Sequence, residues 1–396
     1  MRLYILLISC LLTVTAAHGT ETPDSASLLP LEFKASLITF FPGSEVFELY
    51  GHTDLRIQAS DGTDMIFNYG VFDFTSEHFF YRFVKGETDY MCEAYPTRYL
   101  KQGYEGRRMV EQDLNLSNDQ IREMCAFLVL NAQPMYRNYR YKYFSDNCST
   151  RPLNVIENFL GEKISFADDG EQVTFRDVIH RYTRNYAWEE FGIDLLIGLD
   201  ADTVITQRQK MFVPMILMDA LRNVSIVRDG KQMKLVSGER VINDGAPEGL
   251  ILPLTPWWMS PMAVFLLLLA VVAVISALDI KKRHCSRWLD TALWTAATIV
   301  GLLVWYTTFV SVHEATSPNV NVLWLHPFYV LPLVMMFVKR GNRWRRLYHA
   351  ANLLVLAVAL VQWPLSGQVP NLAFFPIIIS LMLRDIVSLT HLRTTK

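Results

Sequence analysis

Cysteine is scarce in this sequence, which has five cysteines among 396 residues. No two of them form a CxxC pair, so the sequence does not predict a zinc site built on cysteines. An excess of charge of one sign is also lacking, because 37 Lys and Arg residues face 39 Asp and Glu residues and the formal net charge is -2. A chain with this balance has no strong electrostatic preference for nucleic acid or for acidic partners.

Hydrophobic runs, by contrast, are abundant, and they divide the chain into two unlike parts. Residues 25–250 read as a mixed, charged, globular sequence, whereas residues 257–396 consist of apolar runs separated by short basic clusters. The chain begins with "MRLYILLISCLLTVTAAHG", in which one Arg precedes an apolar stretch and then small residues. This order is typical of a secretory signal peptide, which we place at residues 1–18 with a suitable cleavage position after Ala17; an uncleaved anchor is the alternative. Lipidation of Cys10 is not expected, because the apolar run continues beyond it.

The second part predicts a bundle of five transmembrane helices, each near the ~20 residues that cross a bilayer. The apolar runs lie at about 262–280, 289–312, 320–338, 347–363 and 365–383. The connections "KKRHCSR" and "KRGNRWRR" are basic, whereas "HEATSPNVN" and "PLSGQVPN" contain no Lys or Arg. The positive-inside rule therefore puts the basic connections and the C-terminus in the cytoplasm and residues 25–250 outside, as an exported domain.

The four cysteines that follow the signal peptide differ in their expected surroundings. An exported domain permits a disulfide between Cys92 and Cys125. Cys125, however, follows a capping box of Ser117 and Gln120 and falls on the apolar face of the predicted helix, which favours a buried thiol instead. Cys285 lies in a basic cytoplasmic connection and is expected to stay reduced.

The segment "VFELYGHTDLRIQASDGTDMIFNYGVFDF", residues 46–74, predicts a β-hairpin. His52, Asp54 and Arg56 alternate with apolar or small residues, which is strand periodicity, and "SDGTD" is a turn signal. A hairpin of this length brings His52 close to Asn68 on the neighbouring strand. Asp54 lies on the same face of its strand as His52 and competes with Asn68 for contact with the imidazole.

Cys148 in "YFSDNCSTRP" is expected at the start of a helix, because apolar residues follow it with helical spacing. A helix start stabilises a thiolate through free backbone N–H groups and the helix dipole. Pro152 requires that the first turn be distorted or that Thr150 cap a helix starting just after it. A cysteine at a helix start with a histidine and an amide on adjacent strands is the papain-like arrangement, here in the permuted order His52, Asn68, Cys148. A structural cysteine and histidine remain the alternative on spacing alone.

Several segments resemble the Lnb family, which is associated with bacterial lipoprotein N-acylation. They are "PGSEVFELYGHTDLRI", "DMIFNYGVFDF", "EQDLNLSNDQ", "FSDNCSTRPLNVIENFLG", "TFRDVIHRY" and "FGIDLLIGLDAD". They cover most of residues 30–220 and are similar to the family's N-terminal periplasmic domain, and the membrane part fits its layout. The order of His and Cys also resembles lecithin:retinol acyltransferase and permuted NlpC-type peptidases. The resemblance implies an α+β, permuted papain-like domain in the periplasm, residues 25–250, followed by the all-α transmembrane bundle, residues 257–396, in the bacterial inner membrane.

What the resemblance implies is a thiol acyltransferase, with Cys148 as nucleophile, His52 as base, and Asn68 or Asp54 as the third residue. Tyr50 and Arg151 flank the site and would bind an oxyanion or a phosphate, or else pack and form an ion pair. His78 and His180 have no partner pattern. In the polar loop of the membrane part, a substrate-facing rim is one interpretation and loop solvation is the other; a metal site of His313, Glu314 and His326 is disfavoured by its spacing. The candidate rim residues are His313, Asn319, Asn321 and His326.

The sequence and the resemblance together predict a lipoprotein N-acyltransferase. A phospholipid would donate an acyl chain to Cys148, and the α-amino group of a diacylglycerol-modified N-terminal cysteine would accept it. The expected partners are these two lipids and the membrane, with no nucleic acid, and no metal or organic cofactor is implied. Two alternatives are a permuted NlpC-type cell-wall amidopeptidase and a non-catalytic envelope assembly protein.

Overall fold

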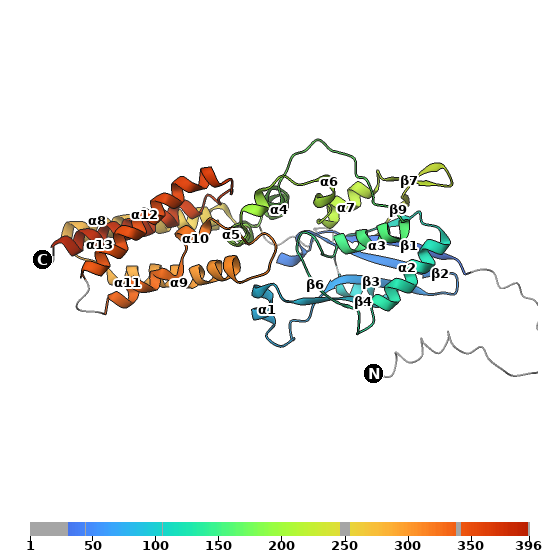
Figure 1. Ribbon diagram of the computed structural model, residues 1–396, viewed down its shortest axis with the longest axis horizontal. Helices are drawn as coiled ribbons and strands as arrows, with labels where there is room; N and C mark the ends of the chain where they lie inside the picture. The colour runs from blue at the N-terminus through green and yellow to red at the C-terminus, as the bar shows by residue number, and fades with distance from the viewer. Residues whose placement is uncertain (1–30, 44, 105, 246–253, 338–341, 395–396) are drawn as a thin grey trace, which may run out of the picture. The chain divides into compact units, whose positions relative to one another are not determined.

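A seven-stranded antiparallel sheet forms the centre of the N-terminal domain, a name that we use for residues 33–245. The computed structural model (Figure 1) describes residues 31–43, 45–104, 106–245, 254–337 and 342–394. The predicted signal peptide lies outside these residues. The strands occur in the spatial order β6-β4-β3-β2-β1-β5-β9. Their bounds are β1 Phe33–Phe40, β2 His52–Ala59, β3 Asp64–Val71, β4 Asp89–Pro96, β5 Met109–Leu114, β6 Asn138–Arg140 and β9 Val236–Asn243.

The predicted hairpin is confirmed as β2 and β3. Asp54 pairs with Asn68 and Gln58 pairs with Asp64, so the strands turn back through the "SDGT" segment as expected. Alternation along the strands then divides the sheet into two faces. Leu55 and Phe67 point into the main hydrophobic core, whereas Ile66 belongs to a smaller cluster on the opposite face.

Helices of the N-terminal domain cover the face that bears Leu55 and Phe67. Side chains of α2, α3 and α7 contribute to that main core. The predicted capping box at the start of α2 is present, since Ser117 Oγ accepts from Gln120 N and Gln120 Oε1 accepts from Ser117 N. The helices are α1 Phe79–Lys85, α2 Asn118–Asn131, α3 Thr150–Leu160, α4 Phe175–Thr183, α5 Ala187–Leu196, α6 Gln207–Lys210 and α7 Pro214–Leu221. Short 3-10 helices lie at Val46–Glu48, Thr97–Gly103 and Leu199–Asp202, and a small separate hairpin is formed by β7 Ser225–Arg228 and β8 Lys231–Lys234.

In the C-terminal part, which the structure describes over residues 254–337 and 342–394, four helices are long and apolar enough to cross a membrane. They are α8 Pro261–Lys282, α9 Arg287–Phe309, α12 Asn342–Ser366 and α13 Phe374–Thr394. We call this part the helical bundle. The predicted third span, about 320–338, is instead broken into α10 Asn321–Trp324, the 3-10 helix Pro327–Tyr329 and α11 Val330–Met335. Pro327 has no N–H to donate and holds the preceding His326 in an extended conformation, which interrupts the helix.

Two charged residues of α13 are more deeply buried than the sequence suggests. Arg384 and Asp385 lie near the predicted cytoplasmic end, where charged side chains can reach water, but both are fully buried. Arg384 donates to Asp279 Oδ2 at 2.9 Å and to Asp290 Oδ1 at 2.6 Å, and Asp385 accepts from Asn352 Nδ2 at 2.7 Å. Helices α8, α9 and α12 thus supply polar partners for both residues inside the bundle.

The cysteines of the described residues are all free. Cys92 is buried in the main core, and Cys125 lies at its edge on α2. The optional Cys92–Cys125 disulfide is therefore not formed, and the packing interpretation of Cys125 is the one that the structure supports.

Candidate active site

The imidazole of His52 lies between two oxygen acceptors at the end of the β2–β3 hairpin. His52 is the first residue of β2, and its Nε2 is 2.9 Å from Asn68 Oδ1 and 3.1 Å from Asp54 Oδ1. Both partners are acceptors in this arrangement, so Nε2 carries the proton and Nδ1 is left as the basic nitrogen. The hairpin thus places both candidates for the third residue, Asn68 and Asp54, at the same nitrogen of His52.

Tyrosines on the same side of the sheet hold these two acceptors in place. Asn68 Nδ2 donates to Tyr104 Oη at 2.9 Å, which fixes the side-chain amide with its oxygen toward the imidazole. Tyr95 Oη donates to Asp54 Oδ2 at 3.2 Å. The Tyr104 ring is stacked near His52 with a centroid separation of 5.8 Å. Asp54 is fully buried and Asn68 nearly so, which leaves little freedom for either group to turn away.

Cys148 lies two residues before Thr150, the first residue of α3, and thus near a helix start, as the sequence predicts. Asn147 caps the turn, because its Oδ1 accepts from the backbone N–H groups of Ser149 (2.8 Å) and Thr150 (2.9 Å). The backbone N–H of Cys148 has no acceptor among the described residues. A free N–H beside a nucleophile is suited to stabilise an oxyanion that forms on the substrate.

Pro152 does not disturb this helix start. In a regular helix its N–H would bond the carbonyl of Cys148, four residues earlier, but proline has no N–H. The carbonyl oxygen of Cys148 instead accepts a hydrogen bond from Thr53 Oγ1 on β2. Thr53 is fully buried, so this bond joins the helix start directly to the strand that carries His52.

Gly70, at the end of β3, lies where Cys148 and His52 approach each other. A Cβ built at Gly70 would be 3.3 Å from Cys148 Cβ and 3.7 Å from His52 Cε1. The backbone of Gly70 has φ +101°, a conformation that side chains disfavour. Glycine therefore leaves open the narrow space across which the imidazole faces the thiol.

The electrostatics of the site favour a protonated imidazole. Burial alone favours neutral His52, but the negative charge that Cys148 can carry and the hydrogen bond to Asp54 outweigh it, and they raise the pKa of His52 to about 10. Burial also raises the pKa of Tyr141 well above its ordinary value, and the nearby Cys148 charge adds to this rise. Tyr141 therefore remains a neutral O–H donor beside the sulfur.

Tyr50 and Arg151 are engaged in packing and ion pairing. The Tyr50 ring lies edge-on to Tyr143 at a centroid separation of 5.7 Å, and burial raises the pKa of Tyr50 to about 12. Arg151 pairs with Asp146 at 2.6 Å and lies 3.5 Å from the ring centroid of Tyr139. In this structure both side chains are used by the surrounding protein.

Three of the four candidate rim residues, His313, Asn319 and Asn321, join the N-terminal domain to the helical bundle. Asn319 Nδ2 donates to Leu195 O at 3.1 Å, and Asn321 Nδ2 donates to the carbonyls of Asp194 (3.2 Å) and Leu195 (3.0 Å). These are carbonyls at the C-terminal end of α5, which a helix leaves without partners of its own. Asn319 and Asn321 are buried, so in this structure their amides cap α5 and are not open to a substrate.

The two rim histidines lie in different surroundings. His313 contacts Phe83 O of α1 through Nε2 at 2.6 Å, whereas His326 is buried in the bundle, where its Nε2 is 2.9 Å from Asn352 Oδ1. Glu314 accepts from the backbone N–H groups of Phe144 and Ser145, each at 3.2 Å, just before Cys148. His313, Glu314 and His326 thus serve three different contacts.

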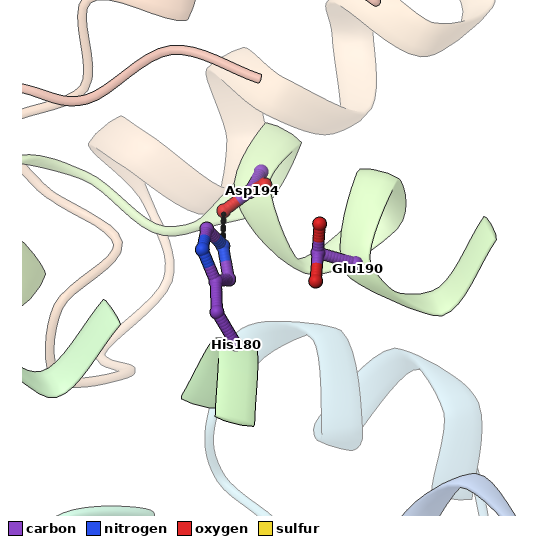
Figure 2. A group of neighbouring side chains, drawn as sticks. All are labelled: His180, Glu190 and Asp194. Carbon is purple, nitrogen blue, oxygen red and sulfur yellow. Dashed lines mark hydrogen bonds and ion pairs between the residues drawn. The ribbon is translucent and has the colours of Figure 1, made fainter. Parts of the chain in front are cut away.

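A second cluster of titratable side chains lies at this joint. Figure 2 shows His180 of α4 facing Glu190 and Asp194 of α5, with ligand-type atoms within 4.8 Å of one another. His180 Nε2 is 2.9 Å from Asp194 Oδ1, but Arg176 Nη1 donates to the same oxygen at 2.6 Å. Asn371 of the bundle donates to Asp194 Oδ2 at 2.9 Å. Because a guanidinium already supplies the positive charge, this cluster is better suited to hold α5 against the bundle than to bind a metal. His78, the other histidine without a pattern, is exposed at the start of α1.

Several residues that shape the site escape sequence reasoning. Thr53 donates to the Cys148 carbonyl, Asn147 accepts from the two backbone N–H groups that follow Cys148, and Gly70 leaves space beside it. Roles of this kind depend on contacts that only the folded chain makes. The "NC" pair and the glycine that ends "FNYG" were the available signals. Tyr104 has no signal in the sequence, since it lies 36 residues after Asn68, just beyond the end of a 3-10 helix.

Comparison with known families agrees with both parts of the chain. The family model described as the Lnb N-terminal periplasmic domain matches residues 26–182, and the one described as the Lnb transmembrane domain matches residues 254–396. No significant match to a curated protein or to a solved structure is found. The two matches, the four long apolar helices and the sheet-rich domain agree on a multi-pass inner-membrane protein with a periplasmic N-terminal domain. The chain belongs to the Lnb-type family.

Proposed function

We propose that this protein is a lipoprotein N-acyltransferase that works through a thioester on Cys148. Membership of the Lnb-type family suggests a role in lipoprotein maturation in the envelope and is consistent with an enzyme. The observation that carries the proposal is the meeting of His52 and Cys148 across Gly70, with Asn68 and Asp54 both on the far nitrogen of the imidazole. This is the geometry of a thiol nucleophile with an oriented base.

In the first half-reaction the Cys148 sulfur attacks an ester carbonyl of a phospholipid. Before this attack the thiol proton is already on His52 Nδ1, so the sulfur attacks as a thiolate beside the imidazolium. The backbone N–H of Cys148 stabilises the tetrahedral oxyanion. The ester C–O bond breaks, and the imidazolium returns its proton to the departing lysophospholipid oxygen. The acyl chain is left on Cys148 as a thioester.

In the second half-reaction the free α-amino group of a diacylglycerol-modified N-terminal cysteine attacks the thioester carbonyl. An α-amino pKa of roughly 7.7–8.0 leaves a neutral fraction that can act as nucleophile near neutral pH. His52 takes the proton from the attacking amine, the C–S bond breaks, and the thiolate is restored beside the imidazolium. The products are an N-acylated lipoprotein and the original enzyme.

The third residue of the site is best described as a pair. Asn68 and Asp54 contact the same Nε2, and we assign Asn68 to fix the ring and Asp54 to stabilise its positive charge. A neutral amide accepts the N–H without drawing off the proton, whereas the buried carboxylate favours the imidazolium that forms in each half-reaction.

The attachment of the domain to the membrane favours lipid substrates over the cell-wall peptide of the alternative hydrolase. Glu314, in the loop after α9, binds the backbone just before Cys148, and α5 is capped by bundle residues. The segment that leads into Cys148 is thus bound by a loop of the helical bundle. A hydrolase of soluble peptides needs no such contact.

Mass spectrometry of lipoproteins from cells that depend on this protein for N-acylation tests the proposal. Cys148→Ser is expected to abolish N-acylation at a normal protein level, whereas Cys125→Ser, the matched control on α2, retains it. Full N-acylation in cells that carry only Cys148→Ser would exclude the thioester mechanism.

A further inference from the structure

Five large aromatic side chains are exposed on one region of the N-terminal domain, and we call them the aromatic patch. Their exposed fractions run from 45% to 74%. They come from α1 and from the segments near it in space, since Phe47 contacts Phe72 and Phe74 contacts Phe79. An exposed apolar surface of this kind marks an interaction site. The members are Phe47, Phe74, Phe80, Tyr81 and Phe83.

The patch lies at the periplasmic end of the transmembrane helix α9. Tyr81 is 6.4 Å from Tyr306 between ring centroids, and Val312 N donates to Lys85 O at 2.9 Å. Figure 1 shows α1 next to this end of α9. Tyr306 precedes the last residue of α9, Phe309, by three positions, which is roughly 4.5 Å along a helix axis. The patch is therefore at the depth where α9 leaves the hydrocarbon, the interfacial zone in which aromatic side chains are enriched.

The charged residues of α1 do not interrupt this apolar surface. Arg82 pairs with Asp89 at 2.7 Å, and Lys85 pairs with Glu87 at 2.8 Å. Each cation thus has a nearby carboxylate within the N-terminal domain. The exposed surface of α1 therefore consists mainly of aromatic rings.

A row of aromatic rings leads from the patch to Cys148. Phe74 is 4.7 Å from Phe72, Phe72 is 5.1 Å from Tyr90, and Tyr90 is stacked on Tyr141 at 4.2 Å, all between ring centroids. Tyr141 in turn lies 3.8 Å from the position that a Cβ of Gly70 would occupy, beside Cys148. The row joins the membrane interface to the nucleophile without a break.

We propose that the aromatic patch enters the outer leaflet of the inner membrane and that the ring row guides a phospholipid acyl chain to Cys148. The inference rests on the proposed function, because it names the path by which the donor of that reaction arrives. A lipid chain is the occupant that fits, since the patch is apolar, lies at interfacial depth and is continuous with the site. An ester carbonyl just below the headgroup would reach the sulfur while the chain remains against the rings.

Photo-crosslinking tests contact with lipid without any need for catalysis. A benzoylphenylalanine is placed at position 80 or, as a control, at position 227 in the exposed β7–β8 hairpin, in full-length protein reconstituted into phosphatidylethanolamine vesicles. After illumination, a phospholipid mass on the peptide containing position 80 but not on that containing position 227 is expected. Absence of lipid at position 80 would overturn the proposal, whatever the protein's activity.

Kinetics with two acyl donors test the path itself. The double variant Phe80→Ser/Tyr81→Ser is compared with the control Met135→Ser/Val227→Ser. The exposed fractions are similar: 74% for Phe80 and 58% for Tyr81, and 82% for Met135 and 68% for Val227. Acylation of Cys148 from long-chain phosphatidylethanolamine vesicles is expected to fall at least tenfold in the aromatic variant only. Acylation by p-nitrophenyl acetate in detergent is expected to stay within twofold of the parent in both variants.

The possible outcomes distinguish a failure of the proposed lipid path from a failure of the proposed acylation of Cys148. Equal rates from vesicles for the two double variants would overturn the path, and so would an equal loss with both donors in the aromatic variant. Failure of the unaltered protein to acylate Cys148 with either donor would instead contradict the proposed function, and the crosslinking result would still decide whether the patch meets lipid.

Discussion

At the scale of single residues, the site depends on how one imidazole is held. His52 Nε2 contacts both Asn68 and Asp54. Tyr104 accepts a hydrogen bond from the Asn68 amide, and Tyr95 donates one to the Asp54 carboxylate. Strand alternation and a turn signal were enough to predict that Asn68 and Asp54 compete for His52. The supporting tyrosines could not be predicted, because no local pattern relates a residue just beyond a 3-10 helix to an amide on a distant strand.

Asn68→Ala and Asp54→Asn separate the two contacts to Nε2. Loss of the Asn68 oxygen leaves Cys148 and His52 present but poorly aligned, and we expect a loss on the order of 10²-fold in acyl transfer. Asp54→Asn keeps the shape and removes the charge. Rates are measured with purified protein in lipid, a phospholipid donor and a lipopeptide acceptor, with thermal unfolding as a folding control. A larger defect in Asp54→Asn than in Asn68→Ala would transfer the orienting role to Asp54.

The pH dependence of thioester formation reports the charge on His52. Its pKa is raised from an ordinary value near 6.5 to about 10, so the imidazolium persists up to about pH 10 and is lost as the pH rises through that value. This proton also stabilises the folded state. Its full contribution to the free energy of unfolding is present below about pH 6.5 and is lost as the pH rises through about 10.

We therefore expect the alkaline fall in Cys148 acylation near pH 10. Asp54 is one cause of the raised pKa, so Asp54→Asn is expected to move this fall to lower pH. Asn68→Ala changes no charge, and it should lower the rate and leave the midpoint nearly in place. Initial rates across a pH series in the three proteins provide the measurement. An alkaline midpoint near 6.5 in the unaltered protein would contradict the assignment.

At the scale of elements, one helix start is fixed to one hairpin. The sequence predicted β2, β3 and α3 correctly, because alternation, the turn and the apolar spacing are local signals. Local signals could not predict the order of the strands in the sheet, because β5 pairs with β9, which lies more than a hundred residues later in the chain. The role of Pro152 was also left open, because the hydroxyl that replaces its missing N–H belongs to another element.

Thr53→Val tests this link between β2 and α3. The substitution keeps the shape and removes the hydroxyl, so the Cys148 carbonyl loses its partner at a buried position. An unsatisfied buried acceptor costs about 1–3 kcal/mol, and the displaced carbonyl is expected to lower Cys148 acylation as well. Thr53→Ser keeps the hydroxyl and is the matched control. Thermal unfolding in detergent and initial rates should show a defect in Thr53→Val that is much smaller in Thr53→Ser; equal behaviour of the two would argue against the bond.

At the scale of the whole molecule, the turn that carries Cys148 and the helical bundle are linked through polar contacts. Glu314 holds the backbone before Cys148, and Asn319 and Asn321 cap α5. The sequence indicated an outward-facing domain on a membrane anchor, because hydropathy and loop charge are strong signals. It could not reveal that the polar loop residues serve the joint, nor that the third apolar run is broken. The count of five spans remains a prediction, with four long helices and one interrupted segment in the structure.

The buried guanidinium of Arg384 is expected to be essential to the bundle. It compensates Asp279 and Asp290, and its removal would leave two carboxylates without a cation. Arg384→Met is expected to cost about 3–5 kcal/mol and to lower the amount of folded protein in the membrane. The triple variant Arg384→Met/Asp279→Asn/Asp290→Asn removes the charges together and should recover much of the loss. Protein level and thermal unfolding are the measurements, and a triple variant as unstable as Arg384→Met would show that charge compensation is not the cause.

The central claim is that Cys148 carries the acyl chain between the two lipids. The most direct test is mass spectrometry of the purified protein after incubation with vesicles of a single phospholipid and no acceptor. We predict one acyl group on the peptide containing Cys148, released by neutral hydroxylamine and transferred to the α-amine when a diacylglyceryl lipopeptide is added. No adduct on Cys148, or an adduct that the lipopeptide fails to remove while N-acylation proceeds, would contradict this account.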